Sequence, residues 1–312
     1  MNQHFTLPPS DEAISVAVAS EGFAGTLPLQ HRERPAGTAL FDLGQLEVRW
    51  EAALGTLWTY MTPVDRPNFN RPMLRDFQRW QSEIGREFAD RSEGLKYLVL
   101  GSRFPGIFNL GGDLDLFANL IIAGDRDGLI RYGRNCVSIL HNNLRRLELP
   151  IVTVALVQGD ALGGGFEAVL SFNVIVAEKG VRFGLPEIAF GLFPGMGAHC
   201  LLSRKVGLAR AEEMMLSNRL YTAEEMYDMG IVHILAEPGC GEEAVRAYIT
   251  KNGRRQAGHC GIYQASSLSD PITLEELNAI VEVWADSALC LSPVDLKLMR
   301  RLADAQVRLA AA

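Results

Sequence analysis

The sequence has little of what marks a disulfide-bonded or metal-binding protein. Five cysteines are spread over 312 residues, an odd number, and none of them forms a C-x-x-C pair. The six histidines show no i, i+4 pairing and no H-E-x-x-H motif. We therefore expect reduced thiols and no structural metal.

Patterns typical of membrane, secreted and nucleic-acid-binding proteins are also lacking. No apolar run approaches the length of a membrane span, and the N-terminus has no charged segment followed by an apolar one. The net charge of −7 argues against general binding to nucleic acids or membrane surfaces. Neither G-x-S-x-G nor G-x-x-x-x-G-K-[ST] occurs, which disfavours serine hydrolases and P-loop enzymes. These features predict a cytoplasmic protein.

What the sequence does contain is an alternation of apolar strands and helices. We predict an α/β fold with a mostly parallel sheet covered on both faces, because the strands are nearly continuous in apolar residues. Residues 1–40 are predicted to be a weakly ordered extension, and residues 253–271 a polar loop. The predicted strands are 46–50, 57–61, 95–100, 151–157, 174–177 and 232–236. The predicted helices are 71–90, 114–147 with a break near 124, 201–206, 209–217, 223–229, 242–250, 274–291 and 293–310.

The stretch 150–197 carries the strongest chemical signal. An apolar strand leads into the glycine turn 163–165, and a short helix with Glu167 follows. A second carboxylate, Glu187, comes 20 residues later, behind the sequence FGLP. Glycines let backbone N–H groups approach a ligand closely at a helix start. Two carboxylates and an N–H-rich turn predict acid–base chemistry beside a polarised carbonyl.

Each feature also has an ordinary structural explanation. A run of glycines is more often a turn than an anion site, and Glu187 after a proline is typical of a surface turn. Glu167, however, has the apolar neighbours Phe166, Ala168 and Val169, and a carboxylate in such surroundings is either paired or functional. A second glycine pair precedes Asp113, a good N-cap, and it equally suits a tight turn into a helix.

Taken together, three motifs in order resemble the crotonase (enoyl-CoA hydratase/isomerase) superfamily. They are FNLGGD, ALVQGDALGGGFE and RFGLPEIAFGLFPGMG, and the resemblance covers roughly residues 45–310. It implies a ClpP/crotonase-like fold. Residues 41–235 would form a core of repeated ββα spiral units, and residues 236–312 a helical region for trimerisation and for covering the acyl pocket. The closest resemblance is to the diffusible-signal-factor (DSF) synthases, through FNLGGDLDLF, LFPGMGA and LYTAEEMYDMG.

The resemblance also implies roles for individual residues. The oxyanion hole falls on the backbone N–H groups of Gly112 and Gly164, and the two hydratase carboxylates fall on Glu167 and Glu187. No cofactor is implied. Met196, Trp284 and Leu302 match the acyl-pocket lining, although ordinary core packing explains them as well. The full set of implied substrate-binding residues is Gly111, Leu162, Gly163, Met196, Trp284 and Leu302.

The implied activity is dehydration of a medium-chain 3-hydroxyacyl group on acyl carrier protein to a cis-2-enoyl group, followed by thioester hydrolysis. An ordinary 2-enoyl-CoA hydratase is the alternative. Coenzyme A users place a cation two residues before the loop phenylalanine, where this chain has Gly106, with Arg103 further back. The segments 204–205 and 251–255 are candidates for a basic carrier-protein surface, although solvated helix ends explain them too. The resemblance further implies a trimer or pair of trimers, and a sensor kinase as a partner.

Overall fold

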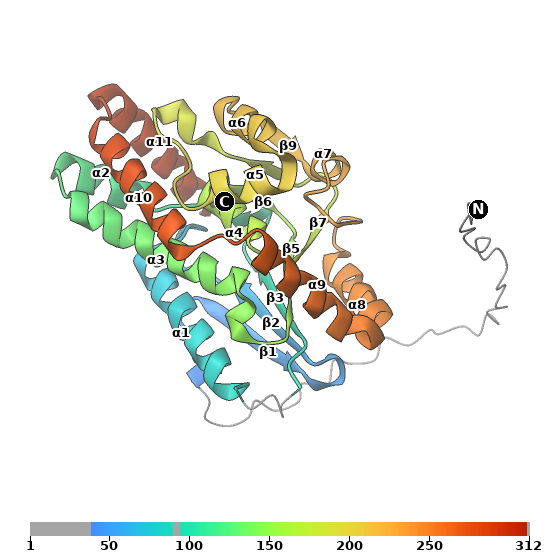
Figure 1. Cartoon of the computed structure of the whole chain (residues 1–312). Coiled ribbons are helices and arrows are strands. Elements are labelled where there is room, and N and C mark those ends of the chain that lie inside the picture. The colour runs from blue at the N-terminus through green and yellow to red at the C-terminus, as the bar shows by residue number, and fades with distance from the viewer. Residues whose placement is uncertain (1–38, 90–93, 311–312) are drawn as a thin grey trace, which may run out of the picture. The chain divides into compact units, whose positions relative to one another are not determined.

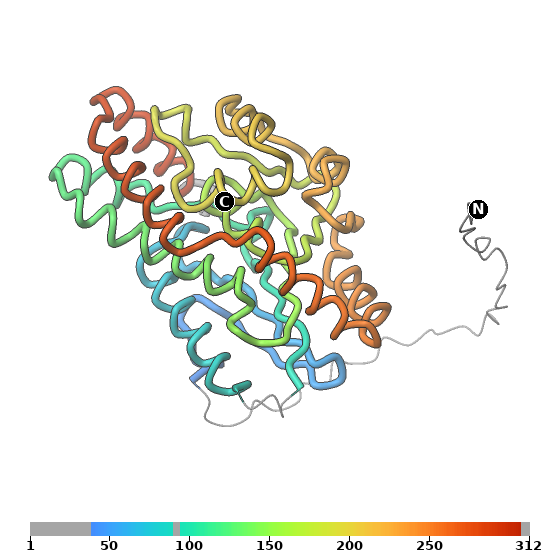
Figure 2. The backbone as a smooth tube through the Cα atoms, viewed as in Figure 1, coloured from blue at the N-terminus to red at the C-terminus, as the bar shows by residue number. Residues whose placement is uncertain are grey.

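The structure, a computed structural model, describes residues 39–89 and 94–310 (Figure 1). The extension predicted for residues 1–40 therefore lies almost entirely outside the described residues. The backbone trace of the described part is shown in Figure 2.

A six-stranded sheet forms the centre of the fold. Its strand order is β1-β2-β3-β5-β7-β10; β1 and β2 are antiparallel, and every other neighbouring pair is parallel. This confirms the predicted mostly parallel sheet. The strands are β1 (Leu46–Glu51), β2 (Thr56–Met61), β3 (Tyr97–Ser102), β5 (Val152–Val157), β7 (Val174–Glu178) and β10 (Ile234–Ala236).

A second sheet of four short strands was not predicted. Its order is β4-β6-β8-β9, with β4 (Ile107–Asn109), β6 (Asp160–Leu162), β8 (Arg182–Gly184) and β9 (Leu220–Thr222). Each of the first three follows a long strand of the main sheet and precedes a helical segment. These repeated ββα units confirm the predicted spiral core. Strands of three residues are too short for an alternating pattern to mark them in the sequence.

Helices cover both faces of the main sheet, which explains its apolar strands. Successive residues of β5 point to opposite faces: Val154 joins the cluster under α8, and Ala155 joins the larger core under α1 and α3. Figure 1 shows α8 and α9 on the side away from α1 and α3. The helices are α1 (Arg71–Glu87), α2 (Leu114–Ile122), α3 (Arg126–Leu144), α4 (Gly164–Leu170), α5 (Ala198–Val206), α6 (Leu208–Leu216), α7 (Ala223–Asp228), α8 (Gly241–Asn252), α9 (Gln256–Ser269), α10 (Leu274–Leu289) and α11 (Pro293–Ala310).

The prediction of a loop over residues 253–271 is wrong, because α9 occupies most of this segment. The sequence of α9 is rich in Ser and Gly and has no apolar stripe at helical spacing. Cys260 is its only buried residue. Contacts with other parts of the fold hold α9 in place instead. The Gln256 side chain donates hydrogen bonds to the Lys96 and Pro150 carbonyls, and these bonds hold the helix start against the sheet.

The C-terminal helices meet at a sharp angle. In the described part of the chain, no single helix is long and apolar enough to cross a membrane; α10 and residues Pro293–Gln306 of α11, bent by 110°, meet that criterion only as a pair. The domain boundary placed near residue 235 stays a prediction. Helix α8, which lies beyond it, packs on β5 and β7.

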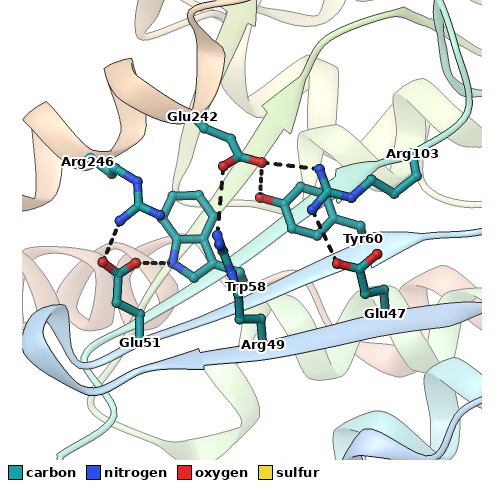
Figure 3. Close-up of polar contacts among 8 residues, drawn as sticks. All are labelled: Glu47, Arg49, Glu51, Trp58, Tyr60, Arg103, Glu242 and Arg246. Atoms are coloured by element: carbon teal, nitrogen blue, oxygen red, sulfur yellow. Dashed lines mark hydrogen bonds and ion pairs between the residues drawn. The ribbon is translucent and has the colours of Figure 1, made fainter. Parts of the chain in front are cut away.

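A network of charged and aromatic side chains fixes α8 to the sheet (Figure 3). The buried Tyr60 hydroxyl on β2 donates to Glu242 of α8 at 2.5 Å. Arg103 stacks over the Tyr60 ring at 3.5 Å and pairs with both Glu242 and Glu47. Next to it, the Trp58 indole N–H donates to Glu51, which also pairs with Arg246.

Within this network, we expect substitution of Glu242 to lower the free energy of unfolding most. Glu242→Ala leaves the buried Tyr60 hydroxyl without an acceptor, so we expect it to lower the free energy of unfolding by roughly 1–3 kcal/mol. The double variant Tyr60→Phe/Glu242→Ala removes the orphaned hydroxyl and should recover part of that loss. Chemical denaturation of the wild type, Tyr60→Phe, Glu242→Ala and the double variant measures the coupling between the two side chains. Strictly additive losses of stability would contradict that coupling.

Candidate active site

One cavity of about 290 Å³ is lined by nearly all the residues implied by the resemblance. Its wall is mostly apolar, with α1, α3 and α4 each contributing one face. Of the ten predicted site residues, Gly111 alone is not part of the wall; it packs directly behind it. The nine that line it are Gly112, Leu162, Gly163, Gly164, Glu167, Glu187, Met196, Trp284 and Leu302.

Two glycine turns meet at one end of this cavity. One follows β3 and β4, the other follows β5 and β6, and β3 and β5 are neighbours in the main sheet. A methyl group on Gly164 would lie 3.2 Å from the Gly111 Cα and 3.5 Å from the Gly112 nitrogen. Within the described residues, neither the Gly112 nor the Gly164 N–H donates to a protein acceptor. The arrangement provides two adjacent free donors, which suits an oxyanion.

Only glycine fits at positions 111 and 163, one in each of the two turns. Gly111 has φ +89°, and a methyl group there would lie 2.6 Å from the Gly164 nitrogen. Gly163 has φ +53°, and its methyl group would lie 2.6 Å from the Glu187 carboxyl oxygen. Both angles disfavour any other residue, and both added atoms would fill the site.

Two polar side chains that sequence reasoning missed hold the first turn. Asn109 accepts a hydrogen bond from the Gly111 N–H at 2.8 Å. The Tyr132 hydroxyl donates to the Phe69 carbonyl at 2.6 Å and accepts from the Asp113 N–H at 3.3 Å. Asn109 stands in the recognised FNLGGD motif, which is a usable signal. Tyr132 lies on α3, where nothing in the sequence distinguishes it from an ordinary core aromatic.

Glu167 is buried in the first turn of α4. Glu167 is 1% exposed, and one of its carboxyl oxygens accepts hydrogen bonds from the backbone N–H groups of Met196 at 2.8 Å and Ala198 at 2.9 Å. These bonds connect α4 to the turn that precedes α5. They favour the ionised carboxylate, whereas burial favours the acid.

Glu187 reaches the cavity from the short helical turn Pro186–Phe190. The residue as a whole is half-buried, but its Oε2 is shielded from solvent and has no hydrogen-bond partner in the described part of the chain. Gly163, in the second glycine turn, lies directly against the other carboxyl oxygen. An unpaired buried carboxyl oxygen is costly unless a ligand or a proton satisfies it.

The two carboxyl groups are electrostatically coupled. Burial raises the pKa of Glu167, and the two N–H donors oppose this rise only in part. Burial also raises the pKa of Glu187, and the neighbouring Glu167 charge raises it further. The pair therefore favours one carboxylate and one carboxylic acid near neutral pH, with the proton on the less well hydrogen-bonded Glu187.

Met196, Trp284 and Leu302, for which the sequence left core packing and an acyl pocket open, pack in the core and also line the cavity. Trp284, on α10, is 2% exposed and packs edge-to-face on Phe117 at 5.1 Å. A methyl group on Gly195 would lie 2.3 Å from the Trp284 ring, so the 193–197 turn is pressed against the indole. Met196 and Leu302 also line the cavity. These side chains line the same cavity as Glu167.

Known proteins share the sequence pattern and the fold of this chain. The sequence profile described as enoyl-CoA hydratase/isomerase matches residues 81–250, more than half of the chain. The chain belongs to this family, and its fold is that of the crotonases. The structure of Pseudomonas aeruginosa DspI superimposes with a TM-score of 0.62 at 24% identity, covering 76% of this chain and 93% of that one.

Two curated relatives match over shorter stretches. A mevalonyl-coenzyme A hydratase (SIDH) of Beauveria bassiana is 46% identical over 104 residues, which are 33% of this chain and 36% of the hydratase. A peroxisomal fatty acid beta-oxidation multifunctional protein (AIM1) of Arabidopsis thaliana is 32% identical over 154 residues, 49% of this chain and 20% of that protein. The match thus spans well under half of each relative.

The raised pKa of Glu187 makes a prediction about stability. A carboxyl whose pKa is higher in the native than in the unfolded state binds more protons when folded, so stability falls as pH rises above the unfolded value near 4.5. Glu187→Gln removes this loss. We expect the variant to be more stable than the wild type by roughly 1–4 kcal/mol at pH 8, since one pKa unit corresponds to about 1.4 kcal/mol, and to lose this advantage near pH 4.5.

Urea denaturation of both proteins across this pH range measures the difference. Glu275→Gln, the same change at an exposed position on α10, is the matched control. A stability difference between Glu187→Gln and the wild type that does not vary with pH would contradict the raised pKa.

Proposed function

We propose that the protein dehydrates a medium-chain 3-hydroxyacyl thioester to the 2-enoyl thioester and then hydrolyses the thioester, as DSF synthases do. The observation that carries the proposal is the pair Glu167 and Glu187 at one cavity, facing two free backbone N–H groups. The DSF-type motifs FNLGGDLDLF, LFPGMGA and LYTAEEMYDMG support the choice within the family.

In this proposal the thioester oxygen lies between the N–H groups of Gly112 and Gly164. Removing the C2 proton moves negative charge onto that oxygen, and preorganised donors stabilise it without reorganisation. Loss of one such donor typically costs about 3–4 kcal/mol in the transition state. The apolar wall strengthens the effect, because it excludes water from the developing charge.

The two carboxyl groups supply the acid–base steps. The ionised member removes the proton from C2, and the protonated member gives its proton to the departing 3-hydroxyl, which leaves as water. The overall proton count of the pair is unchanged, so the pair is ready for another turnover after one internal proton exchange. Their raised pKa values suit both tasks near neutral pH.

Thioester release needs no further group in the same cavity. A water molecule attacks the held carbonyl carbon, and a glutamate takes its proton. The C–S bond then breaks, and the same glutamate returns the proton to the sulfur of the leaving thiol. Trp284 and Met196, which line the same cavity as Glu167, are the candidate walls that hold the chain in the folded conformer required for a cis alkene.

The charges around the loop favour a carrier-protein substrate over a nucleotide. Arg103 is the cation nearest the position where coenzyme A users have one, and its guanidinium is already engaged by Glu47, Glu242 and the Tyr60 ring (Figure 3). A phosphate would have to compete with two carboxylates for this side chain.

The basic surfaces suggested by the sequence fit this proposal less well. Arg204 is paired with Asp270 and Glu276. The segment 251–255 lies beside Gln256, at the start of the parallel strands, whereas the glycine turns follow the strand ends. The carrier-protein surface, the sensor kinase partner and the trimer therefore stay predictions.

An enoyl-CoA hydratase is the second candidate function. The 46% identity to a coenzyme A hydratase over 104 residues favours it, and the same two glutamates serve hydration. The two functions differ in the thioester carrier, in the alkene geometry and in whether free acid is released.

Product analysis distinguishes them. The purified protein is incubated with a medium-chain 3-hydroxyacyl group on carrier protein and, in parallel, on coenzyme A, followed by mass spectrometry and determination of the alkene geometry. We expect a cis-2-enoic free acid from the carrier-protein substrate. A trans-2-enoyl-CoA without free acid would instead assign the protein to the ordinary hydratases.

Substitution of either glutamate should abolish dehydration and leave the fold intact. Glu167→Gln and Glu187→Gln keep the side-chain shape but cannot transfer the proton, so we expect the rate to fall at least 100-fold. Circular dichroism and thermal melting check that both variants are folded. A folded variant of either kind that forms product at the wild-type rate would refute the assignment.

The contact between the glycine turns can be tested with one methyl group. Gly111→Ala places a Cβ 2.6 Å from the Gly164 nitrogen, so we expect at least a 100-fold loss in kcat/KM. Gly124→Ala is the matched control, because Gly124 has a similar positive φ of +65° with open space around it. Equal losses in the two variants would mean that backbone strain, and not the blocked donor, is responsible.

A further inference from the structure

Three side chains of the cavity wall keep a buried oxygen without a hydrogen-bond partner among the residues that the structure describes. They are Glu187, Asn143 and Gln306. Glu187 belongs to the acid–base pair, and Gln306 lies on α11, which packs on α2. Asn143 lies elsewhere, in the last turn of α3, and is only 4% exposed. The catalytic proposal gives Asn143 no role.

Asn143 lines the cavity at the end of α4 that is farther from the glycine turns. Gly164 and Ser171, at the two ends of α4, both line the cavity, and Asn143 donates to the Ser171 hydroxyl at 2.8 Å. On α3, the lining begins at Tyr132, beside the first glycine turn, and ends at Asn143. At about 1.5 Å per residue, the two ends of α4 are roughly 10 Å apart.

This far end is polar, in contrast to the apolar wall between the two ends. The Ser171 hydroxyl donates to the Ala168 carbonyl, and Gln81 donates to the Ile139 carbonyl. Asn142 donates to the Gln81 side-chain oxygen. Each of these groups thus has a partner, and the Asn143 oxygen is the exception at this end of the described cavity wall.

The free atom is an acceptor and not a donor. The Asn143 amide nitrogen donates to the Ser171 carbonyl at 3.1 Å, and a carbonyl oxygen can only accept. Turning the amide over would set two acceptors against each other, so Oδ1 is the atom left for a ligand. A buried acceptor of this kind is retained at a cost to stability unless something donates to it.

We infer that the acyl chain of the substrate ends in a hydroxyl group that donates to Asn143 Oδ1. The inference rests on the proposed function, because it takes the thioester to lie at Gly112 and Gly164. A terminal ammonium is disfavoured, since no carboxylate lies at this end among the described lining residues to pair with it, and a terminal carboxylate would meet another acceptor. With C–C bonds of about 1.5 Å in a zigzag, a span of roughly 10 Å corresponds to a chain of about eight carbons.

Two matched substrates test the inference. The wild-type protein is given 3-hydroxyoctanoyl and 3,8-dihydroxyoctanoyl groups on carrier protein and on coenzyme A. We expect kcat/KM to be at least ten-fold higher for the chain with the terminal hydroxyl. Equal values, or a higher value for the plain chain, would overturn the inference and leave the proposed function standing.

Binding without turnover separates the two proposals. If neither thioester reacts, the proposed function fails, and calorimetry with 8-hydroxyoctanoate and octanoate still examines Asn143. Tighter binding of the hydroxy acid supports the site. Equal binding, as expected if Asn143 only holds a buried water, overturns it.

Two variants complete the test. Asn143→Leu keeps the side-chain volume and removes the acceptor, so it should reverse the preference in favour of the plain chain. Asn135→Leu makes the same change about two turns earlier on α3, at an exposed position outside the cavity wall, and should leave the preference unchanged. A preference for the terminal hydroxyl that persists in Asn143→Leu would contradict the assignment.

Discussion

The site depends on the close packing of two glycine turns. Gly111 and Gly164 approach so closely that no side chain fits between them, and this contact leaves two backbone N–H groups free at the cavity. The approach is possible because β3 and β5 are adjacent parallel strands, so the turns that follow them lie side by side. Asn109 and Tyr132 hold the first turn, and Gly163 lets Glu187 pack against the second.

Charge is the second constraint on the site, and it opposes stability. Glu167 and Glu187 are enclosed where water would otherwise hydrate them. Glu167 receives two backbone hydrogen bonds, whereas Glu187 Oε2 has no partner among the described residues. The fold retains a proton on the pair instead of ionising both groups. A site that only stabilised the fold would have no need of this arrangement, whereas proton transfer to and from a substrate requires both forms at once.

The main sheet, the two glycine turns and both glutamates could be predicted from the sequence. Buried parallel strands such as β5 are continuous in apolar residues, and the glycine motifs and both glutamates stand in recognisable surroundings. The misses have physical reasons too. Strands of three residues show no period, α9 is held by tertiary contacts rather than by an apolar stripe, and the roles of Tyr132 and Asn143 depend on which groups the fold brings against them. Which carboxyl group retains the proton depends on the hydrogen bonds that Met196 and Ala198 donate, and those follow only from the folded backbone.

The most direct test of the account is the protonation state of the carboxyl pair. Infrared difference spectra of the wild-type protein and the double variant Glu167→Gln/Glu187→Gln, recorded across neutral pH, report whether a carboxylic acid persists in the fold. The account predicts one protonated carboxyl at pH 7 in the wild type that is missing in the double variant. Complete ionisation of both glutamates at pH 7 would contradict the raised pKa values and, with them, the proposed division of acid and base.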